Sequence, residues 1–292
     1  MNLRTKGYLL GIAAASTYGM NPLFALPLYQ RGMNSDSVLL FRYMLAIFVI
    51  GGVMVLEKRS FLLPKKDLLL TVVMGILMAA SSLFLFQSYF YMDAGIASTM
   101  LFVYPIMVAL GMSLFFKERL TWQTCLCTFM AVGGIFLLYK QTGGATLSVT
   151  GTVLVFLSAL SYAVYIISVN QTHLREVSAL VLTFYVLVFG TFLFVGRIAT
   201  GAVSLTMPNT PLMWACALAI ALFPTAISFF CSARAIQYIG PTPTAILGAL
   251  EPLTAIFFGV LVFGERLTLR DWTGVFLILA AVTLVVCRRR QR

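Results

Sequence analysis

The chain is a succession of long apolar runs separated by short polar breaks, and this pattern predicts membrane-spanning helices. An α-helix crosses the hydrocarbon core of a bilayer in about 20 residues, because each residue advances the helix by about 1.5 Å. The shortest break, Asp93-Ala94-Gly95, separates the third run from the fourth. The predicted spans are residues 7–28, 36–56, 68–92, 95–116, 122–139, 150–170, 178–198, 211–236, 242–263 and 270–287.

Composition excludes a soluble globular protein. Of the 292 residues, 61% are hydrophobic and only 10% are charged, and the mean hydropathy is +0.98. A soluble domain carries charge on about a quarter of its residues because its surface faces water. Ten spans with short loops use the whole length, so we expect a lipid bilayer around the chain and no separate soluble domain.

The net charge of +11 fits a topology signal better than a nucleic-acid surface, because Lys and Arg concentrate in cytoplasmic loops. With ten spans both termini lie on one side, and that side carries thirteen basic residues against five on the other. We therefore expect cytoplasmic termini and no nucleic-acid partner. The thirteen are Arg4, Lys6, Lys58, Arg59, Lys65, Lys66, Lys117, Arg119, Arg175, Arg288, Arg289, Arg290 and Arg292, and the five are Arg31, Lys140, Arg197, Arg266 and Arg270.

The second half of the sequence repeats landmarks of the first in the same order. FFKERLTW at 115–122 matches FGERLT at 263–268, and five ordered matches indicate an internal duplication. We place the two halves at residues 1–145 and 146–292. The matched positions are Gly7 with Gly151, Thr17-Tyr18 with Ser161-Tyr162, residues 95–99 with 240–244, Pro105 with Pro252, and Glu118 with Glu265.

The duplication has a consequence for function, because each half has five spans. An odd number of spans makes the two halves cross the membrane in opposite orientations. Inverted repeats can adopt two related states, open to either side around one site near the midplane. The expected fold class is therefore an all-α integral membrane protein, with ten transmembrane helices as two inverted five-helix repeats around a central cavity. This arrangement favours transport.

The paired segments YPIMVALGMSLFFKERLT (104–121) and EPLTAIFFGVLVFGERLT (251–268) resemble the drug/metabolite transporter superfamily, in its EamA-type branch. SYFYMDAGIAS (88–98) and SARAIQYIGPTPT (232–244) fit the same pattern, so the resemblance covers essentially the whole chain. It implies that the first, third, fourth, sixth, eighth and ninth helices line the cavity. The chain departs from the pattern at Tyr104, where the second half has Glu251, since glutamate is common before this proline in the family.

Glu251 is the acidic residue that lies well inside a predicted span. A charge at that depth costs several kcal/mol, about 2.5–3.5 on insertion scales for comparable residues. Such a side chain faces a cavity or a partner, or it stays protonated. Two interpretations are left open: Glu251 binds a solute or a proton, or it is a protonated or hydrogen-bonded group that stabilises the helix break at Pro252.

Two basic residues also lie inside predicted spans, Arg42 in the second and Arg234 near the cytoplasmic end of the eighth. The simpler expectation is that both side chains extend to the nearest interface. The alternative is that one of them pairs with an anionic substrate group or with Glu251. Arg42 is the poorer cavity candidate, because the resemblance makes the second helix peripheral.

Pro105, Pro224 and Pro252 interrupt predicted spans, since proline lacks an N–H and clashes with the preceding turn. The freed carbonyls must find partners or line a cavity, so we expect helix breaks there, with simple packing kinks as the alternative. The other residues at similar depth suggest an amphipathic cavity with few charges. The cavity candidates are Tyr18, Asn21, Ser82, Gln87, Tyr104, Tyr162, Tyr165, Thr225, Ser228 and Glu251.

Together these features predict a secondary transporter of the cytoplasmic (inner) membrane that moves a small metabolite, such as an amino acid or a drug-like compound, by alternating access. We expect export rather than import, and neither enzyme activity nor a metal or cofactor, because the single histidine, His173, lies in a short loop. Proton coupling is left open. The alternatives are a non-saturable channel or facilitator, and a non-transporting receptor or scaffold.

Overall fold

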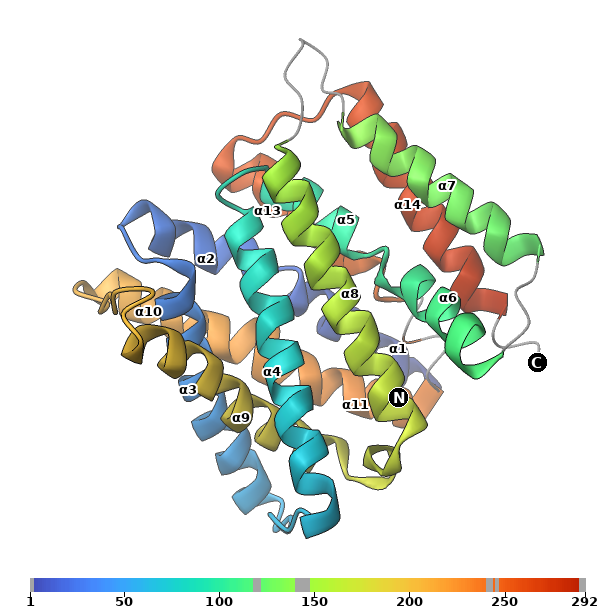
Figure 1. The fold of residues 1–292 in the computed structure, drawn as a ribbon. Helices are drawn as coiled ribbons and strands as arrows, with labels where there is room; N and C mark the ends of the chain where they lie inside the picture. The colour runs from blue at the N-terminus through green and yellow to red at the C-terminus, as the bar shows by residue number, and fades with distance from the viewer. Residues whose placement is uncertain (1–2, 118–121, 140–147, 240–243, 245–246, 289–292) are drawn as a thin grey trace.

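The computed structural model describes residues 3–117, 122–139, 148–239, 244 and 247–288, and the regular structure in these ranges is helical (Figure 1). The helices before residue 140 are α1 (Leu3–Tyr18), α2 (Asn21–Gln30), α3 (Ser35–Leu56), α4 (Lys65–Ser88), α5 (Ala94–Leu101), α6 (Tyr104–Phe116) and α7 (Trp122–Tyr139). The later elements are α8 (Val149–Gln171), η1 (His173–Glu176), α9 (Ala179–Ala199), α10 (Pro211–Ala221), η2 (Leu222–Ile227), α11 (Ser228–Ile239), α13 (Leu250–Phe263) and α14 (Leu269–Arg288).

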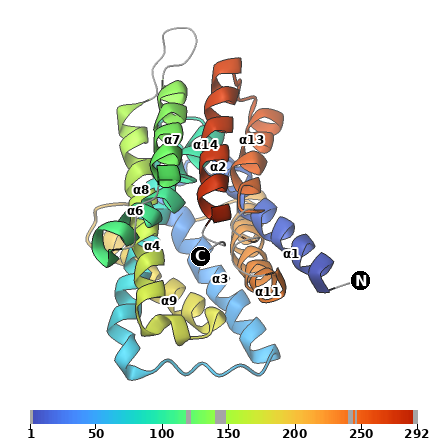
Figure 2. The same ribbon diagram turned by 90° about the vertical axis from the view of Figure 1, so that its right-hand side faces the viewer.

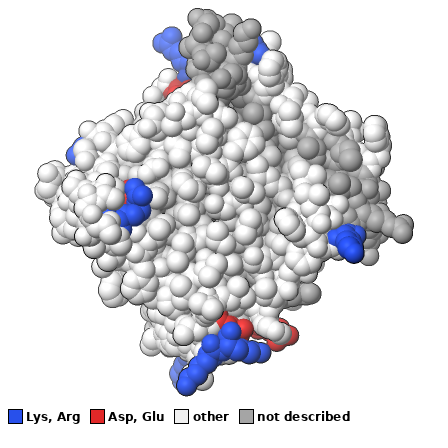
Figure 3. Space-filling view, in the orientation of Figure 1, with Lys and Arg blue, Asp and Glu red and all other residues white. Residues whose placement is uncertain are grey.

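The surface of the helices is suited to lipid. Within the described residues, seven segments are long and apolar enough to cross a membrane: α1–α2, α3, α4, α5–α6, α8, α9 and α10–α11, while α13 is a shorter apolar helix. Large apolar side chains such as Phe48, Leu114 and Phe129 are about three-quarters exposed. Figure 3 shows a broad central face without charged side chains, with the charges towards its edges. The chain is therefore a multi-pass membrane protein, and the count of ten spans stays a prediction.

The helix contacts follow the pseudo-two-fold symmetry of an inverted repeat. α1 packs against α11, and its counterpart α8 packs against α4. The equivalent helices α3 and α9 pair with each other, and so do the equivalent helices α7 and α14 (Figure 2). α5 of the first half packs against α13 of the second. In Figure 1 the α2–α3 and α9–α10 connections lie at one end of the molecule and the α3–α4 and α8–α9 connections at the other, so α3 and α9 run in opposite directions. The repeat is inverted as predicted, whereas its boundary at 145–146 falls outside the described residues.

Polar side chains join the two halves where small residues let the helices approach. Ser81 of α4 and Ser158 of α8 each donate a hydroxyl hydrogen bond to the other residue's carbonyl oxygen, at 3.0 and 2.7 Å. Both serines are buried. Such contacts satisfy polar groups that lipid cannot satisfy, and they hold transmembrane helices in register. These two hydrogen bonds therefore hold α4 and α8 together beside the centre of the molecule.

Helix interruptions lie close to the centre of several spans. α1 ends at Tyr18 before α2 starts at Asn21, and α5 ends at Leu101 before α6 starts at Tyr104. Two of the three predicted prolines fall in the first turn of a helix, Pro105 in α6 and Pro252 in α13, where the missing N–H costs nothing. The third, Pro224, lies in the π-helical turn η2 between α10 and α11. These interruptions surround the candidate site.

Candidate solute-binding site

Two small cavities adjoin at the centre of the molecule, with volumes of about 140 Å³ and 20 Å³. Three residues, Tyr18, Leu101 and Glu251, line both. The larger cavity lies on the side where α1 begins and is also lined by Gly11, Ala14, Ala15, Tyr104, Tyr162, Ser228, Phe229, Ser232, Thr244 and Gly248. The smaller lies on the opposite side and is also lined by Gly19, Asn21, Pro22, Leu85, Tyr89, Ser98 and Pro252.

Glu251 lies in the first turn of α13, directly before Pro252, and it lines both cavities. The ion pairs of the described residues are Arg59–Glu57, Arg197–Asp36 and Arg234–Glu57, so Glu251 takes part in none of them. The preceding helix break allows this placement, because it exposes the start of α13 to the cavity rather than to a packed helix surface. An acid in this position can bind a proton or a cationic group.

Three tyrosines surround this acid. Tyr104 of α6 and Tyr162 of α8 meet edge to face, with ring centroids 4.7 Å apart. Tyr18, at the end of α1, lines both cavities with Glu251, and Tyr104 lines the larger cavity with it. The repeat-related pair Tyr104 and Glu251 thus meets at one cavity. The wall offers aromatic faces and hydroxyl groups, which suits a small amphipathic solute.

The smaller cavity carries buried polar atoms without a protein partner. Asn21 donates from Nδ2 to the carbonyl oxygen of Tyr18 at 2.9 Å, which fixes the amide and leaves its Oδ1 unpaired. The hydroxyl of Tyr89 is likewise buried without a hydrogen-bond partner. Buried polar groups are normally satisfied, so these two atoms make the smaller cavity a polar chamber that can take up water or a polar solute group.

Arg42 corrects the sequence interpretation. Its side chain does not extend to the interface, because the residue is only 3% exposed. Its Nε donates to Oγ1 of Thr225 at 3.0 Å, and its guanidinium lies over the ring of Phe86. α3 packs directly against η2, so Arg42 meets Thr225 at this contact. The guanidinium of Arg42 therefore lies next to Tyr18, which lines the two cavities, whereas Arg42 itself does not line them.

Arg234 extends as the sequence predicts, towards the end where α1 begins. Its Nη2 lies 3.2 Å from Oε1 of Glu57, and its guanidinium lies over the ring of Phe230. The Arg234 side chain is partly exposed, and its ion pair in this structure is with Glu57. The pairing of Arg234 with Glu251 stays a hypothesis.

The structure brings only part of the predicted lining together. Tyr18, Asn21, Tyr104, Tyr162, Ser228 and Glu251 line the cavities, whereas Ser82, Gln87, Tyr165 and Thr225 do not. Ser82 is hydrogen-bonded to the hydroxyl of Tyr43 at 2.9 Å, and Tyr165 stacks on Tyr162. Depth in a span could be read from the sequence, but the face of the helix could not. The same limit explains why Tyr89, Ser98, Phe229 and Ser232 were missed.

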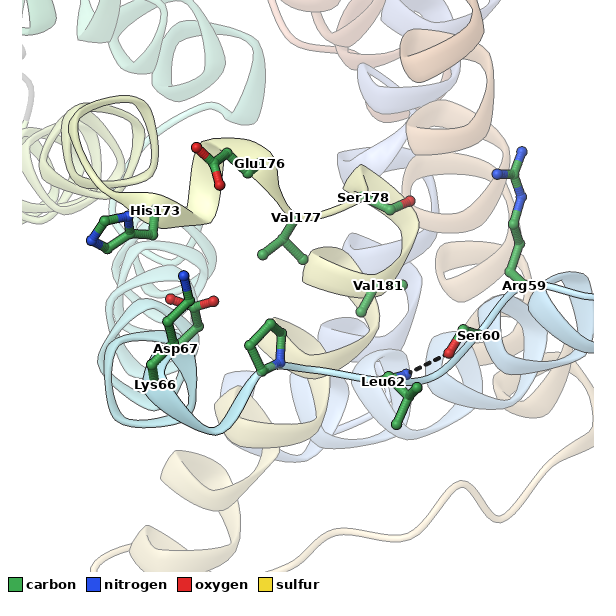
Figure 4. A pocket seen from close by; sticks show the side chains of 11 residues that line it. Arg59, Ser60, Leu62, Lys66, Asp67, His173, Glu176, Val177, Ser178 and Val181 are labelled. Atoms are coloured by element: carbon green, nitrogen blue, oxygen red, sulfur yellow. Dashed lines mark hydrogen bonds between the residues drawn. The ribbon is translucent and has the colours of Figure 1, made fainter.

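A larger pocket of about 470 Å³ lies elsewhere, at the end of the molecule that holds the α3–α4 connection (Figure 4). His173, Glu176 and Ser178 from the α8–α9 connection line it, together with Lys66 and Asp67 at the start of α4. The pocket carries charges of both signs and shares no residue with the two central cavities. We therefore do not include it in the solute pathway.

Comparisons with known proteins agree with this architecture. The model of the EamA-like transporter family matches residues 5–140 and again residues 149–287. An uncharacterized transporter of Archaeoglobus fulgidus is 27% identical over 227 residues, which cover 76% of each chain. The uncharacterized transporter YxxF of Bacillus subtilis is 24% identical over 232 residues, 78% of this chain and 73% of the relative. One crystal structure superposes with a TM-score of 0.71 at 15% identity over 98% of both chains, a likeness of fold alone.

Proposed function

The chain belongs to the EamA-like transporter family, and we propose that it carries a small metabolite across the inner membrane by alternating access, with Glu251 at the binding site. That it is a membrane transporter rather than an enzyme follows from the family and from the names of its relatives. The observation that carries the proposal is the position of Glu251. It is an acid at a helix break, at the junction of two cavities and between two inverted halves.

The arrangement of the halves supports alternating access. The site is built from α1, α6, α8, α11 and α13, which belong to both halves, and α5 of the first half is in direct contact with α13 of the second. In inverted-repeat transporters the binding site stays near the midplane while the halves rock around it. A relative movement of α5 and α13 would widen one cavity and narrow the other, with Glu251 accessible from each side in turn.

The cavity suggests the class of solute. Its volume of about 140 Å³ is well below the roughly 300–1,000 Å³ of sites for drug-sized ligands. Aromatic rings, small hydroxyl residues and one acid line it, and Arg42 lies nearby. We infer that the solute is an amino acid or a metabolite of similar size, with a cationic or hydrogen-bonding group directed to Glu251.

The orientation is proposed from charge. The end that holds the start of α1 and the α3–α4 and α8–α9 connections carries most of the basic residues, which supports a cytoplasmic location for this end. The larger cavity then lies on the cytoplasmic side of Glu251 and the polar chamber on the outer side. A solute bound from the cytoplasm and released outside corresponds to export.

Counterflow into proteoliposomes tests this function. Purified protein is first screened by thermal shift against amino acids, amines and purines, because a ligand that binds the folded state raises the unfolding temperature. A compound found in this way should then show saturable uptake that is accelerated by the same unlabelled compound inside the vesicles. Linear, non-saturable flux without counterflow would identify a channel, and binding without flux would identify a receptor.

A further inference from the structure

A carboxylate of the second half caps a helix of the first half. Glu265, in the turn between α13 and α14, accepts hydrogen bonds from the backbone N–H groups of Ala94 (2.9 Å, Oε1) and Gly95 (3.3 Å, Oε2) at the start of α5. The first N–H groups of a helix lack partners within the helix and attract negative charge. Asp93 occupies the N-cap position of α5 but makes no capping bond with its side chain. Glu265 supplies the cap instead.

The turn that presents Glu265 is shaped for this contact by three glycines. Gly264 adopts a left-handed conformation, with φ of 68°, and the N–H of Glu265 bonds the carbonyl oxygen of Gly259 at 3.0 Å. A Cβ added to Gly95 would lie 3.0 Å from Oε2 of Glu265, and one added to Gly259 would overlap the carboxylate. The next turn is fixed by a capping box, in which the N–H of Thr268 donates to Oδ2 of Asp271 and the N–H of Asp271 donates to Oγ1 of Thr268.

The contact lies at the end of the molecule opposite the start of α1, directly beyond the polar chamber. Ser98, one turn after Gly95 in α5, lines that chamber, and Pro252 lines it from α13. The chamber measures about 20 Å³, against about 140 Å³ for the cavity on the other side of Glu251. The pathway is therefore narrow where Glu265 holds α5 to the α13–α14 turn.

We propose that the contact of Glu265 with the start of α5 is a latch that closes the outer end of the pathway, and that its closure takes up a proton from the outer side. The latch rests on the alternating-access function proposed above and on the cytoplasmic placement of the termini. The latch adds a proton-binding site at Glu265 that is separate from Glu251. The sequence repeat indicated only that Glu265 corresponds to Glu118, which lies outside the described residues.

The electrostatic surroundings give the direction of the pH effect. Glu265 lies outside the membrane-spanning helices. Burial and the neighbouring Asp93 raise its pKa from 4.5 to about 7, against the opposing effect of the two N–H groups. Burial and Asp271 raise the pKa of Asp93 as well, and Tyr89 is a further titratable group facing Glu265. The repulsion among acids is relieved when Glu265 is protonated.

The difference in the pKa of Glu265 between the closed and the open state determines the direction in which pH shifts the equilibrium between them. In an open state Glu265 would face water and regain its ordinary pKa, so the closed state binds the proton more tightly. Acidification from pH 7 towards pH 4.5 therefore favours closure, and a more alkaline pH favours opening. With these two pKa values the ratio of closed to open protein should rise about 30-fold between pH 8 and pH 5.5.

Distance measurement by electron paramagnetic resonance tests the latch without any transport assay. Nitroxide labels are placed on cysteines at Tyr91 and Leu269, which are exposed and flank the contact, after the five native cysteines are replaced by alanine. The full-length protein is measured in liposomes at pH 8 and pH 5.5. Glu265→Gln mimics the protonated acid, and Gly95→Ala displaces the carboxylate. Gly196→Ala, at a position with open space around it, is the control.

The latch predicts a longer distance at pH 8 than at pH 5.5 in the native sequence. The distance should be short at both pH values in Glu265→Gln, long at both in Gly95→Ala and native-like in Gly196→Ala. Equal distances at both pH values in the native sequence would overturn proton uptake, and an unchanged distance in Gly95→Ala would overturn the latch. If Gly95→Ala does not fold, the native sequence and Glu265→Gln still decide the question.

The same measurement in Glu251→Gln separates the latch from the proposed transport site. The latch predicts that the pH response of the distance persists in that variant, even if the variant transports nothing. Loss of the response in Glu251→Gln, with its retention in Glu265→Gln, would assign the titration to Glu251 and overturn the role of Glu265.

Discussion

Arg42 of α3 and Thr225 of η2, which are 183 residues apart in sequence, form a buried hydrogen bond of 3.0 Å between Nε and Oγ1. The hydroxyl of Thr225 in turn donates to the carbonyl oxygen of Ile220 at 3.1 Å. The N–H that would normally serve this carbonyl is missing because residue 224 is proline. The hydroxyl of Thr225 thus replaces the missing donor to the Ile220 carbonyl, and Arg42 of the neighbouring helix α3 holds this hydroxyl in place by a second hydrogen bond.

Replacing Thr225 by valine should destabilise the protein although the two side chains have the same shape. The change leaves the Ile220 carbonyl without the hydroxyl and the buried guanidinium without its acceptor, at a cost of about 2 kcal/mol. Thr225→Ser keeps the hydroxyl and should retain most of the stability. Unfolding temperatures of both variants in the same detergent check this, and equal values for the valine and serine variants would contradict it.

The ion pair between Asp36 and Arg197 should stabilise the contact of α3 with α9. Its atoms lie 2.6 Å apart and Asp36 is only 2% exposed, whereas Arg59 in the pair with Glu57 is largely exposed. Asp36→Asn should lower the unfolding temperature by several degrees, at a cost of about 2 kcal/mol. Arg59→Ala should change it little, because exposed pairs contribute about 0–1 kcal/mol. The account fails if the two variants rank in the opposite order.

Gly19 should be intolerant of alanine because it lies in the break between α1 and α2, against α13. A Cβ there would come within 2.7 Å of Cβ of Thr254 and would overlap the carbonyl oxygen of Glu251. Gly19→Ala should therefore reduce both transport and thermal stability. Gly52→Ala, in α3 with open space around it, should be neutral or slightly stabilising. Comparable transport rates in the two variants would argue against a close contact at Glu251.

Tyr104, which lines the larger cavity, and Tyr165, which does not, should differ in their effect on binding. Tyr104 shares that cavity with Glu251, whereas Tyr165 was only predicted to line it. Removing the hydroxyl by Tyr104→Phe should weaken binding of the transported solute several-fold, in line with about 1 kcal/mol for one hydrogen bond. Tyr165→Phe should leave the Kd unchanged. Titration calorimetry distinguishes the two, and a larger effect at Tyr165 would reject the assigned lining.

The sequence predicted the membrane class, the duplication and its inversion because these depend on run lengths and on an odd number of spans. It also identified Glu251 and the helix-breaking prolines, since an acid or a proline is conspicuous in an apolar run. Arg42 was misjudged because the contact of α3 with η2 is not visible in sequence. Gln87 and Tyr165 do not line the two central cavities, because polarity and depth do not tell which face a helix presents. The contact of Glu265 with α5 depends on packing between halves, which no local pattern encodes.

Uptake driven by a pH gradient tests the central claim, that Glu251 is the binding group of an alternating-access carrier. Proteoliposomes are prepared with the native sequence, with Glu251→Gln or with the control Glu176→Gln, which changes a glutamate at the far end of the molecule. The solute found by thermal shift is added outside the vesicles, and a pH gradient is imposed. The account predicts saturable, gradient-accelerated flux for the native sequence and Glu176→Gln, and loss of the acceleration in a folded Glu251→Gln protein. Gradient-dependent flux of native magnitude in Glu251→Gln would contradict it.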